Sequence, residues 1–400
     1  MNARRHFLIG AAFAATIAGL VVGERALEAR AQGAMVQAPM FEVDPVWPKP
    51  LPNQWIMGNV IGVGVDARDH VFIVHRNDTF NDREIGAAKG ISECCNPAPP
   101  VIEFDPEGNV VSAWGGPPSD KSYLWPTSNH GIGVDDKGNI WIGGNGGGNA
   151  ATGQGPDSHI LNFTHDGKYL RTIGVPGRPT NSSTTEHFGR VAKISFDFAA
   201  QEAYVADGYS NHRVAVVDMA SGKVKRFWGA YGNVPSDSNH GPYNPDAPLI
   251  TQFRTPVHCA EPSNDGLVYV CDRPNDRIQV FQKDGKFVKE KQIAPRTLGD
   301  GSVWDIAFSK DAAQKYLYLA DGKNERMYVI ERASLEVLTS FGDGGRQPGM
   351  WFAVHSIATD SKGNIYTTET YEGKRVQKFV YKGVGSVTRA NQGVLWPGKK

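Results

Sequence analysis

The stretch Val205-Ala206-Asp207-Gly208-Tyr209-Ser210-Asn211-His212-Arg213-Val214 decides the fold, because a related stretch follows at Cys271-Asp272-Arg273-Pro274-Asn275-Asp276-Arg277-Ile278. In both, an apolar segment runs through an Asp- and Asn-containing turn into the next segment. Extended outward, the repeating unit has an apolar stretch, a turn of Asp, Ser, Gly and Asn residues, and a β-rich stretch. Two further strands follow and end near Trp-Gly or Phe-Gly. This pattern predicts short antiparallel strands joined by tight turns.

Six copies of this unit follow one another, and they predict an all-β protein: a six-bladed β-propeller with four-stranded antiparallel blades over residues 32–400. The 46 glycines and 25 prolines suit many tight turns. A seventh blade would need residues 32–55 and the C-terminal tail, and neither segment shows the repeat. The opening stretches of the six copies are Ile61–Asp66, Gly131–Asp135, Ala192–Asp197, His258–Pro262, Val303–Ser309 and Val354–Asp360.

The two quoted stretches resemble the NHL-repeat propellers, and the resemblance extends over nearly the whole chain after residue 31. It implies an architecture only, because propellers serve as enzymes and as binding platforms alike. Function must therefore be argued from a site.

Three of the eleven histidines occupy the same position of the repeat. His130 lies five residues before the turn residue Asp135, His258 five before Ser263, and His355 five before Asp360. The other three copies carry Ile61, Ala192 and Trp304 at this position. Histidine therefore occupies alternate blades.

The opening strand of each blade lines the central channel, so three alternate blades place these histidines about 120° apart around the axis. A lone channel-facing histidine is more often a hydrogen-bonded core residue, but three in one phase predict a metal site. Three neutral imidazoles with a fourth position open are typical of catalytic zinc. Imidazole ligands alone leave iron, copper and manganese open as alternatives.

The chain also looks like peptidyl-α-hydroxyglycine α-amidating lyase, a six-bladed propeller of this class. The resemblance implies a zinc ion held by His130, His258 and His355. It implies a catalytic arginine at Arg76, in Phe72-Ile73-Val74-His75-Arg76, and a catalytic tyrosine at Tyr209.

The same resemblance implies a calcium ion held through backbone carbonyls, at positions that match Val63 and Ile132. Both lie two residues after the ring position of their blade. The family has an acidic calcium ligand directly after its third histidine, where this chain has Ser356. It has a methionine two residues before that histidine, where this chain has Ala353. We therefore expect calcium to bind weakly or not at all.

The expected reaction is cleavage of the C–N bond of an α-hydroxy amide. Zinc would lower the pKa of the substrate hydroxyl, Tyr209 would act as general base, and Arg76 would hold a carboxylate or stabilise negative charge. The chain lacks the hydroxylating domain that normally makes the lyase substrate, so another small-molecule or peptide-derived substrate stays open. The alternatives are a metal-dependent hydrolase of the lactonase or esterase type and a non-catalytic propeller scaffold.

Residues 1–31 are expected to be a signal peptide. Arg4-Arg5 precede the apolar run Phe7–Val22, and Ala29-Arg30-Ala31 fits a cleavage site. The Arg pair resembles a twin-arginine signal, and an ordinary signal is the alternative. We expect a periplasmic or secreted protein without stable membrane insertion. The 42 basic and 42 acidic residues balance, which argues against a nucleic-acid partner.

Four cysteines allow three disulfide pairings, and free thiols are a further alternative. Cys259 and Cys271 flank a predicted hairpin turn and could bridge adjacent strands, whereas Cys94 and Cys95 are neighbours. The glycine-rich stretch Gly143–Gly148 follows a strand without a helix after it, so it predicts a loop near the channel mouth and no phosphate-binding site.

Overall fold

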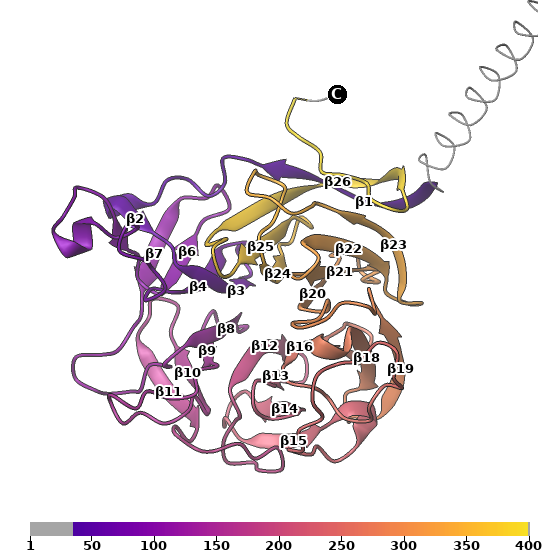
Figure 1. Cartoon of the computed structure of the whole chain (residues 1–400), viewed down its shortest axis with the longest axis horizontal. Helices are drawn as coiled ribbons and strands as arrows, with labels where there is room; N and C mark the ends of the chain where they lie inside the picture. The colour runs from indigo at the N-terminus through magenta and orange to yellow at the C-terminus, as the bar shows by residue number, and fades with distance from the viewer. Residues whose placement is uncertain (1–34, 399–400) are drawn as a thin grey trace, which may run out of the picture.

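The structure is a computed structural model that describes residues 35–398, so the predicted signal peptide lies outside the described residues. Six four-stranded antiparallel sheets are arranged as blades around a central axis, with one innermost strand from each sheet (Figure 1). Neighbouring innermost strands contact each other around the whole ring, including the last with the first. The predicted six-bladed propeller is confirmed.

Within each blade the strands follow one another from the axis outward in chain order. The exception is blade six, where the ring closes and the outermost strand is the N-terminal β1. Blade one has β3 (Asn59–Val65), β4 (Val71–Arg76), β6 (Val101–Phe104) and β7 (Val110–Trp114); blade two has β8 (Asn129–Val134), β9 (Ile140–Gly144), β10 (His159–Phe163) and β11 (Tyr169–Gly174); blade three has β12 (Val191–Asp197), β13 (Glu202–Asp207), β14 (Arg213–Asp218) and β15 (Val224–Trp228). Blade four has β16 (Val257–Pro262), β17 (Leu267–Asp272), β18 (Arg277–Gln282) and β19 (Phe287–Gln292); blade five has β20 (Asp305–Phe308), β21 (Tyr316–Asp321), β22 (Arg326–Glu331) and β23 (Glu336–Phe341); blade six has β24 (Val354–Thr359), β25 (Ile365–Glu369), β26 (Val376–Thr388) and β1 (Met35–Asp44).

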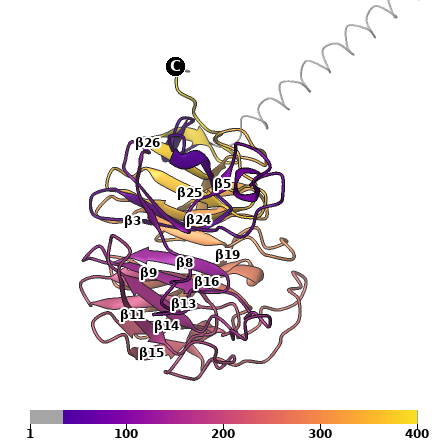
Figure 2. The same cartoon turned by 90° about the vertical axis from the view of Figure 1, so that its left-hand side faces the viewer.

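Blade six is closed by the N-terminal strand β1, which the sequence pattern did not reveal. β1 pairs antiparallel with β26 from Met35↔Thr388 to Asp44↔Lys378. The N-terminal and C-terminal strands lie side by side at one edge of the ring (Figures 1 and 2). Residues 35–44 thus complete the sixth blade, which leaves no strand for a seventh.

The turns between first and second strands show why the repeat requires its aspartate. The Asp135 carboxylate accepts hydrogen bonds from the backbone N–H groups of Lys137 and Asn139 and from the Asn139 side chain. Asp360 does the same in blade six. Gly138 in the first of these turns has a φ of +77°, which glycine adopts without strain.

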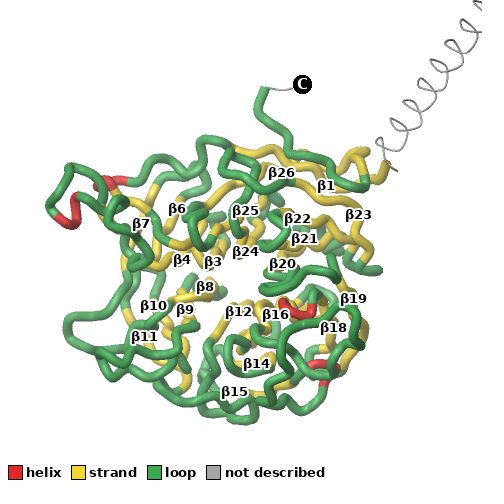
Figure 3. The backbone as a smooth tube through the Cα atoms, in the orientation of Figure 1, coloured by secondary structure: helices red, strands yellow, loops and turns green. Residues whose placement is uncertain are grey.

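The remainder of the described chain is loops with a few short elements (Figure 3). β2 (Trp55–Ile56) pairs with β5 (Asn96–Pro97), and the four 3₁₀ turns are η1 (Pro52–Gln54), η2 (Ala87–Lys89), η3 (Ala230–Gly232) and η4 (Arg273–Asn275). None of the described helices has the length and apolar character needed to cross a bilayer.

The cysteines are paired in two disulfides. Cys259 bridges to Cys271 between the adjacent strands β16 and β17, as the hairpin suggested, and Cys94 bridges to Cys95 in the long loop of blade one. The glycine-rich stretch that begins at the end of β9 continues as a loop, as predicted.

Candidate metal centre

The three in-phase histidines meet on the propeller axis. His130 comes from β8, His258 from β16 and His355 from β24, and all three are at most 4% exposed. One ring nitrogen from each lies within 4.8 Å of the others. The predicted convergence is confirmed, and the cluster is compact enough for three imidazoles to bind one ion with modest adjustment.

Each histidine is oriented by a backbone carbonyl of the next blade, at the same position of the repeat. The Nδ1 atom contacts that carbonyl, which directs Nε2 toward the axis; this is the usual way that proteins fix the tautomer of a metal-binding histidine. Histidine blades therefore alternate with acceptor blades. The pairs are His130 with Ala192 (2.7 Å), His258 with Trp304 (2.5 Å) and His355 with Ile61 (2.6 Å).

Burial keeps the three imidazoles neutral. Desolvation lowers the pKa of His355 to about 3 and the pKa values of His130 and His258 well below the usual 6.5, and nearby positive charges act in the same direction. Neutral imidazoles keep their Nε2 lone pairs, which is the form that binds a metal. The donor set of this cluster therefore fits a borderline ion such as zinc.

Tyr209 lies against this cluster, in the turn after β13. Its hydroxyl oxygen is 2.9 Å from Nε2 of His130 and 3.1 Å from Nε2 of His258. A phenol carries one proton, so it can donate to only one of these two acceptors at a time. The Tyr209 oxygen therefore lies on the Nε2 side of the cluster, against the nitrogens that would hold a metal.

Arg76, at the end of β4, stands at the rim of the same cluster. Its guanidinium donates to the Asn129 carbonyl at 3.3 Å and to the Asn145 side chain at 2.7 Å. Burial lowers the pKa of Arg76 below its ordinary value, while the neighbouring Tyr209 acts in the opposite direction. The structure thus brings Arg76 and Tyr209 together with the histidines, and their catalytic roles remain predictions.

Arg273 is a further site residue that the sequence analysis did not select. It is 7% exposed, and its guanidinium carbon lies 4.5 Å from the centre of the Trp304 ring and 6.0 Å from that of Tyr209. Within residues 35–398 its Nε has no hydrogen-bond partner, and its contact with Asp300 is 3.6 Å long. A buried guanidinium with spare donors beside the histidines is suited to an anionic or carbonyl group of a ligand.

The sequence did hold a signal for Arg273. In blade one, His75 pairs with Val60, and Arg76 follows; in blade four, Asp272 pairs with Val257, and Arg273 follows. The two arginines therefore occupy the same position of the repeat. Since blades one and four face each other in a ring of six, the arginines approach the histidines from opposite sides.

A cavity of about 640 Å³ opens beside the centre on this side of the propeller. Tyr209 and Arg273 line it, together with His240 and Tyr243 of the long loop after blade three. Its size lies in the usual range for small-molecule sites. The long loop between β15 and β16 thus forms a wall of the candidate substrate site.

The region that matches the family's calcium site does not fit a calcium ion. Val63 and Ile132 each line a cavity that Lys193 also lines, and the Lys193 ammonium lies 2.6 Å from Asp305. Burial lowers the Lys193 pKa, but the carboxylates of Asp305 and Glu261 outweigh that effect and raise it above the ordinary value. A fixed positive charge disfavours a hard cation, which depends on ligand charge.

We expect calcium to leave the stability of the protein unchanged. An ion held at about 100 times its Kd would add about 2.7 kcal/mol to the free energy of unfolding, and so several degrees to the melting temperature. Thermal melting in a calcium chelator and in millimolar calcium should give the same midpoint. A calcium-dependent rise of several degrees that Lys193→Met enlarges would contradict this reading of the donor set.

Sequence comparisons give the same class of protein. No protein-family model matches the chain. NHL repeat-containing protein 3 of Mus musculus is 23% identical over 361 residues, which cover 86% of this chain and 85% of that protein. Peptidyl-glycine alpha-amidating monooxygenase B of Xenopus laevis is 24% identical over 328 residues (79% of this chain, 33% of that protein), and the Rattus norvegicus peptidylglycine alpha-amidating monooxygenase is 24% identical over 323 residues (78% and 30%).

The fold and the site thus define a six-bladed β-propeller of the NHL-repeat kind with a three-histidine cluster on its axis. Its homologues are NHL repeat-containing protein 3 and peptidylglycine alpha-amidating monooxygenase. The chain spans about a third of the length of the amidating monooxygenases and most of the length of NHL repeat-containing protein 3.

Proposed function

We propose that this protein is a metal-dependent lyase that cleaves the C–N bond of an α-hydroxy amide at the three-histidine cluster. The observation that carries the proposal is the position of the Tyr209 hydroxyl oxygen, which lies within 3.1 Å of Nε2 of His130 and of His258. Arg76 and Arg273 approach the same cluster from opposite sides. The similarity to amidating monooxygenases supports the type of reaction.

His130, His258 and His355 would hold the metal through Nε2, since their Nδ1 atoms are engaged by carbonyls. The bound ion, with zinc preferred, would supply Lewis-acid activation of the substrate hydroxyl. Tyr209, as the phenolate, is positioned to take the hydroxyl proton at its oxygen and to return it to the amide nitrogen as the C–N bond breaks and the C–O bond becomes a carbonyl. Arg76 and Arg273 would hold the carboxylate of the substrate and fix the reacting carbon near Tyr209.

Activity of the zinc-loaded protein on α-hydroxyglycine amides tests the proposal. The expected products are the primary amide and glyoxylate in equal amounts, measured together. A parallel assay on lactones and esters addresses the alternative of a metal-dependent hydrolase, which the same cluster and cavity would also suit. Hydrolysis of lactones without any release of amide would reverse the order of the two functions.

A non-catalytic scaffold is the third candidate, because NHL repeat-containing protein 3 matches this chain over more of its own length than the amidating monooxygenases do. Bound metal separates the candidates, since a scaffold has no need of a stoichiometric ion on its axis. We further propose that the protein is exported to the periplasm or secreted. The two disulfides support this, because such bonds persist in oxidising compartments.

Arg273→Met should weaken the binding of an acidic substrate. Loss of a hydrogen bond to a charged group costs about 1.5–3 kcal/mol, so KM for an α-hydroxyglycine substrate with a free carboxylate should rise about tenfold or more. The KM for its neutral ester should change much less. Arg296→Met is the matched control, because Arg296 is exposed and pairs only with Asp246 on the outer loops. Equal changes for the acid and the ester would remove Arg273 from carboxylate recognition.

A further inference from the structure

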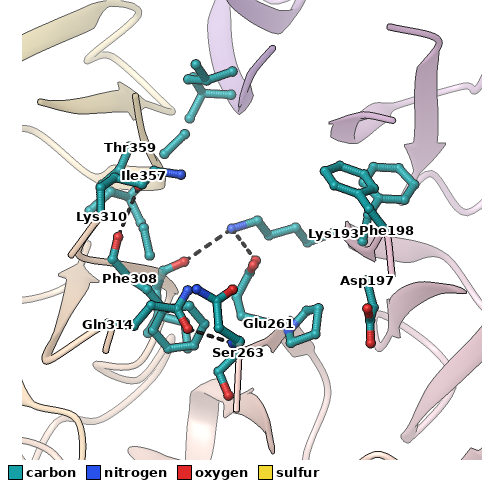
Figure 4. Close-up of a pocket in the computed structure, with 18 of the residues that line it drawn as sticks. Lys193, Asp197, Phe198, Glu261, Ser263, Phe308, Lys310, Gln314, Ile357 and Thr359 are labelled. Carbon is teal, nitrogen blue, oxygen red and sulfur yellow. Dashed lines mark hydrogen bonds and ion pairs between the residues drawn. The ribbon is translucent and has the colours of Figure 1, made fainter. Parts of the chain in front are cut away.

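A second polar cluster lies on the axis, on the other side of the histidines from Tyr209. The Lys193 ammonium of blade three is 2.6 Å from Asp305 of blade five and 2.7 Å from Glu261 of blade four. Asp305 in turn accepts from the Ser356 hydroxyl of blade six at 2.6 Å. Figure 4 shows Lys193 reaching across the channel to Glu261. These four residues, which we call the lysine clamp, join four consecutive blades through side chains alone.

Asp305 and Ser356 of the lysine clamp are buried, and Lys193 and Glu261 are half-buried at its edge. The side chains of Lys193 and Asp305 are 12% and 1% exposed. Asp305 has all its acceptor capacity used, because the backbone N–H groups of Ile357 (3.0 Å) and Ile306 (2.8 Å) also donate to its carboxylate. A buried carboxylate needs such a counter-charge and a full set of donors to stay ionised. The clamp is therefore a fixed arrangement, because a shift of its residues would leave a buried charge without its partner.

The clamp is built on the residues that follow the metal centre in the sequence. Lys193 follows Ala192, whose carbonyl orients His130. Asp305 follows Trp304, whose carbonyl orients His258. Ser356 follows His355 itself. Each of these clamp residues is therefore one peptide bond away from a carbonyl that orients an imidazole, or from a histidine itself. A displacement of a clamp residue along or across the channel would change the orientation of that imidazole.

We infer that Lys193 is a positioning residue for the metal centre. Its ammonium group holds the strands β12, β16, β20 and β24 at the spacing that the three histidines need in order to bind one ion. The inference deepens the proposed function and rests on its metal site. Groups that orient metal ligands typically change metal affinity 10- to 100-fold when they are removed. Here the orienting groups are carbonyls, and the clamp holds the strands that carry them.

The clamp also separates the two ends of the channel. On its far side from the histidines lies a second cavity of about 630 Å³, lined by Lys193, Glu261 and the aromatic residues Phe196, Phe198 and Phe308 (Figure 4). This cavity and the one beside Tyr209 have no lining residue in common. Lys193 can thus be reached from solvent by a small molecule without passing through the metal centre.

Lys193→Met should lower the affinity for zinc and for cobalt(II) by 10- to 100-fold, measured by competition with a chelating dye. The visible absorption bands of bound cobalt(II), which report ligand geometry, should shift or broaden. Lys283→Met is the matched control, since Lys283 lines the same far cavity but pairs with Asp197 away from the clamp. It should leave the affinity and the spectrum unchanged.

A rescue experiment separates positioning from a general loss of stability. In Lys193→Ala, ethylammonium entering from the far cavity should restore much of the metal affinity and the original cobalt(II) spectrum, whereas sodium should not. If the Lys193 variants do not fold, Ser356→Ala removes one hydrogen bond of the clamp and should lower the affinity about 2- to 13-fold, which corresponds to a net loss of roughly 0.5–1.5 kcal/mol per hydrogen bond.

Unchanged metal affinity and an unchanged cobalt(II) spectrum in Lys193→Met would overturn the inference. That result is distinguishable from failure of the proposed function. If the histidine variants lose metal and Lys193→Met does not, the metal site stands and only the clamp's role falls. If the histidine variants keep the metal, the site itself is wrong.

Discussion

Replacing any one of His130, His258 and His355 by alanine is expected to abolish stoichiometric metal binding. Each supplies one of only three protein ligands, and the three Nε2 atoms converge within one small buried volume. The purified wild-type protein, prepared without chelators, should contain about one zinc or iron ion per chain. Elemental analysis should find well under a tenth of this in each variant.

The control for this experiment must remove a buried histidine without touching the axis. His187→Ala does so, because His187 is 7% exposed and its Nε2 contacts the Pro179 carbonyl outside the channel. This variant should keep its metal even if it melts at a lower temperature. Full retention of metal in all three axial variants would show that the histidines form a hydrogen-bonded core and not a metal centre.

Tyr209→Phe is expected to lower turnover by about two to four orders of magnitude, the usual contribution of a positioned proton-transfer group. The substitution removes one oxygen and keeps the ring, so the metal content and the melting temperature should stay close to wild type. The acidic limb of the pH–rate profile should disappear as well, because it reports the protonation of the group that accepts the proton.

Tyr243→Phe is the matched control, since Tyr243 lines the same cavity but donates its hydroxyl to the Pro295 carbonyl. Its turnover should fall little. If Tyr209→Phe retained near-wild-type turnover on the true substrate, Tyr209 would have no part in the proton transfer. The metal-dependent hydrolase would then be the better account of the site.

The axial cluster could be predicted because a propeller converts position in the repeat into position around the axis. Once the blades were aligned, the shared phase of His130, His258 and His355 was enough to place them together. The alternation of histidine and acceptor blades was also implicit in that alignment, because the acceptors Ile61, Ala192 and Trp304 are the other three members of the ring. Their carbonyls were not foreseen, since every residue has one and only the folded geometry selects it.

Other features depend on contacts that the repeat does not encode. Arg273 shares its repeat position with Arg76, but its packing over Trp304 and its unpartnered Nε, which mark it as a site residue, become visible only in the folded chain. The bond between Lys193 and Asp305 joins residues 112 positions apart. In the sequence, Lys193 is simply a charged residue in an apolar strand. Such pairs arise from the meeting of two blades, and one sequence gives no measure of which charges meet.

The strand β1 was missed for a related reason. Met35–Asp44 lies outside the repeat and is an outer strand, and the short alternation of buried Phe41 and Val43 with half-buried Glu42 and Asp44 marks a strand but not the blade to which it belongs. Its partner is more than three hundred residues away. A sequence pattern can show that a strand is possible there, but the open edge of β26 decides where it pairs.

The closure by β1 also sets when the axial cluster can exist during synthesis. His355 belongs to the last blade, and its Nδ1 is held by the carbonyl of Ile61 in the first, across the seam that β1 and β26 join. Almost the entire chain must therefore be synthesised before the third imidazole can take its place. Nascent chains that end before residue 355 carry at most two of the three histidines. The proposed metal could therefore be bound by all three ligands only after nearly the whole chain has been synthesised.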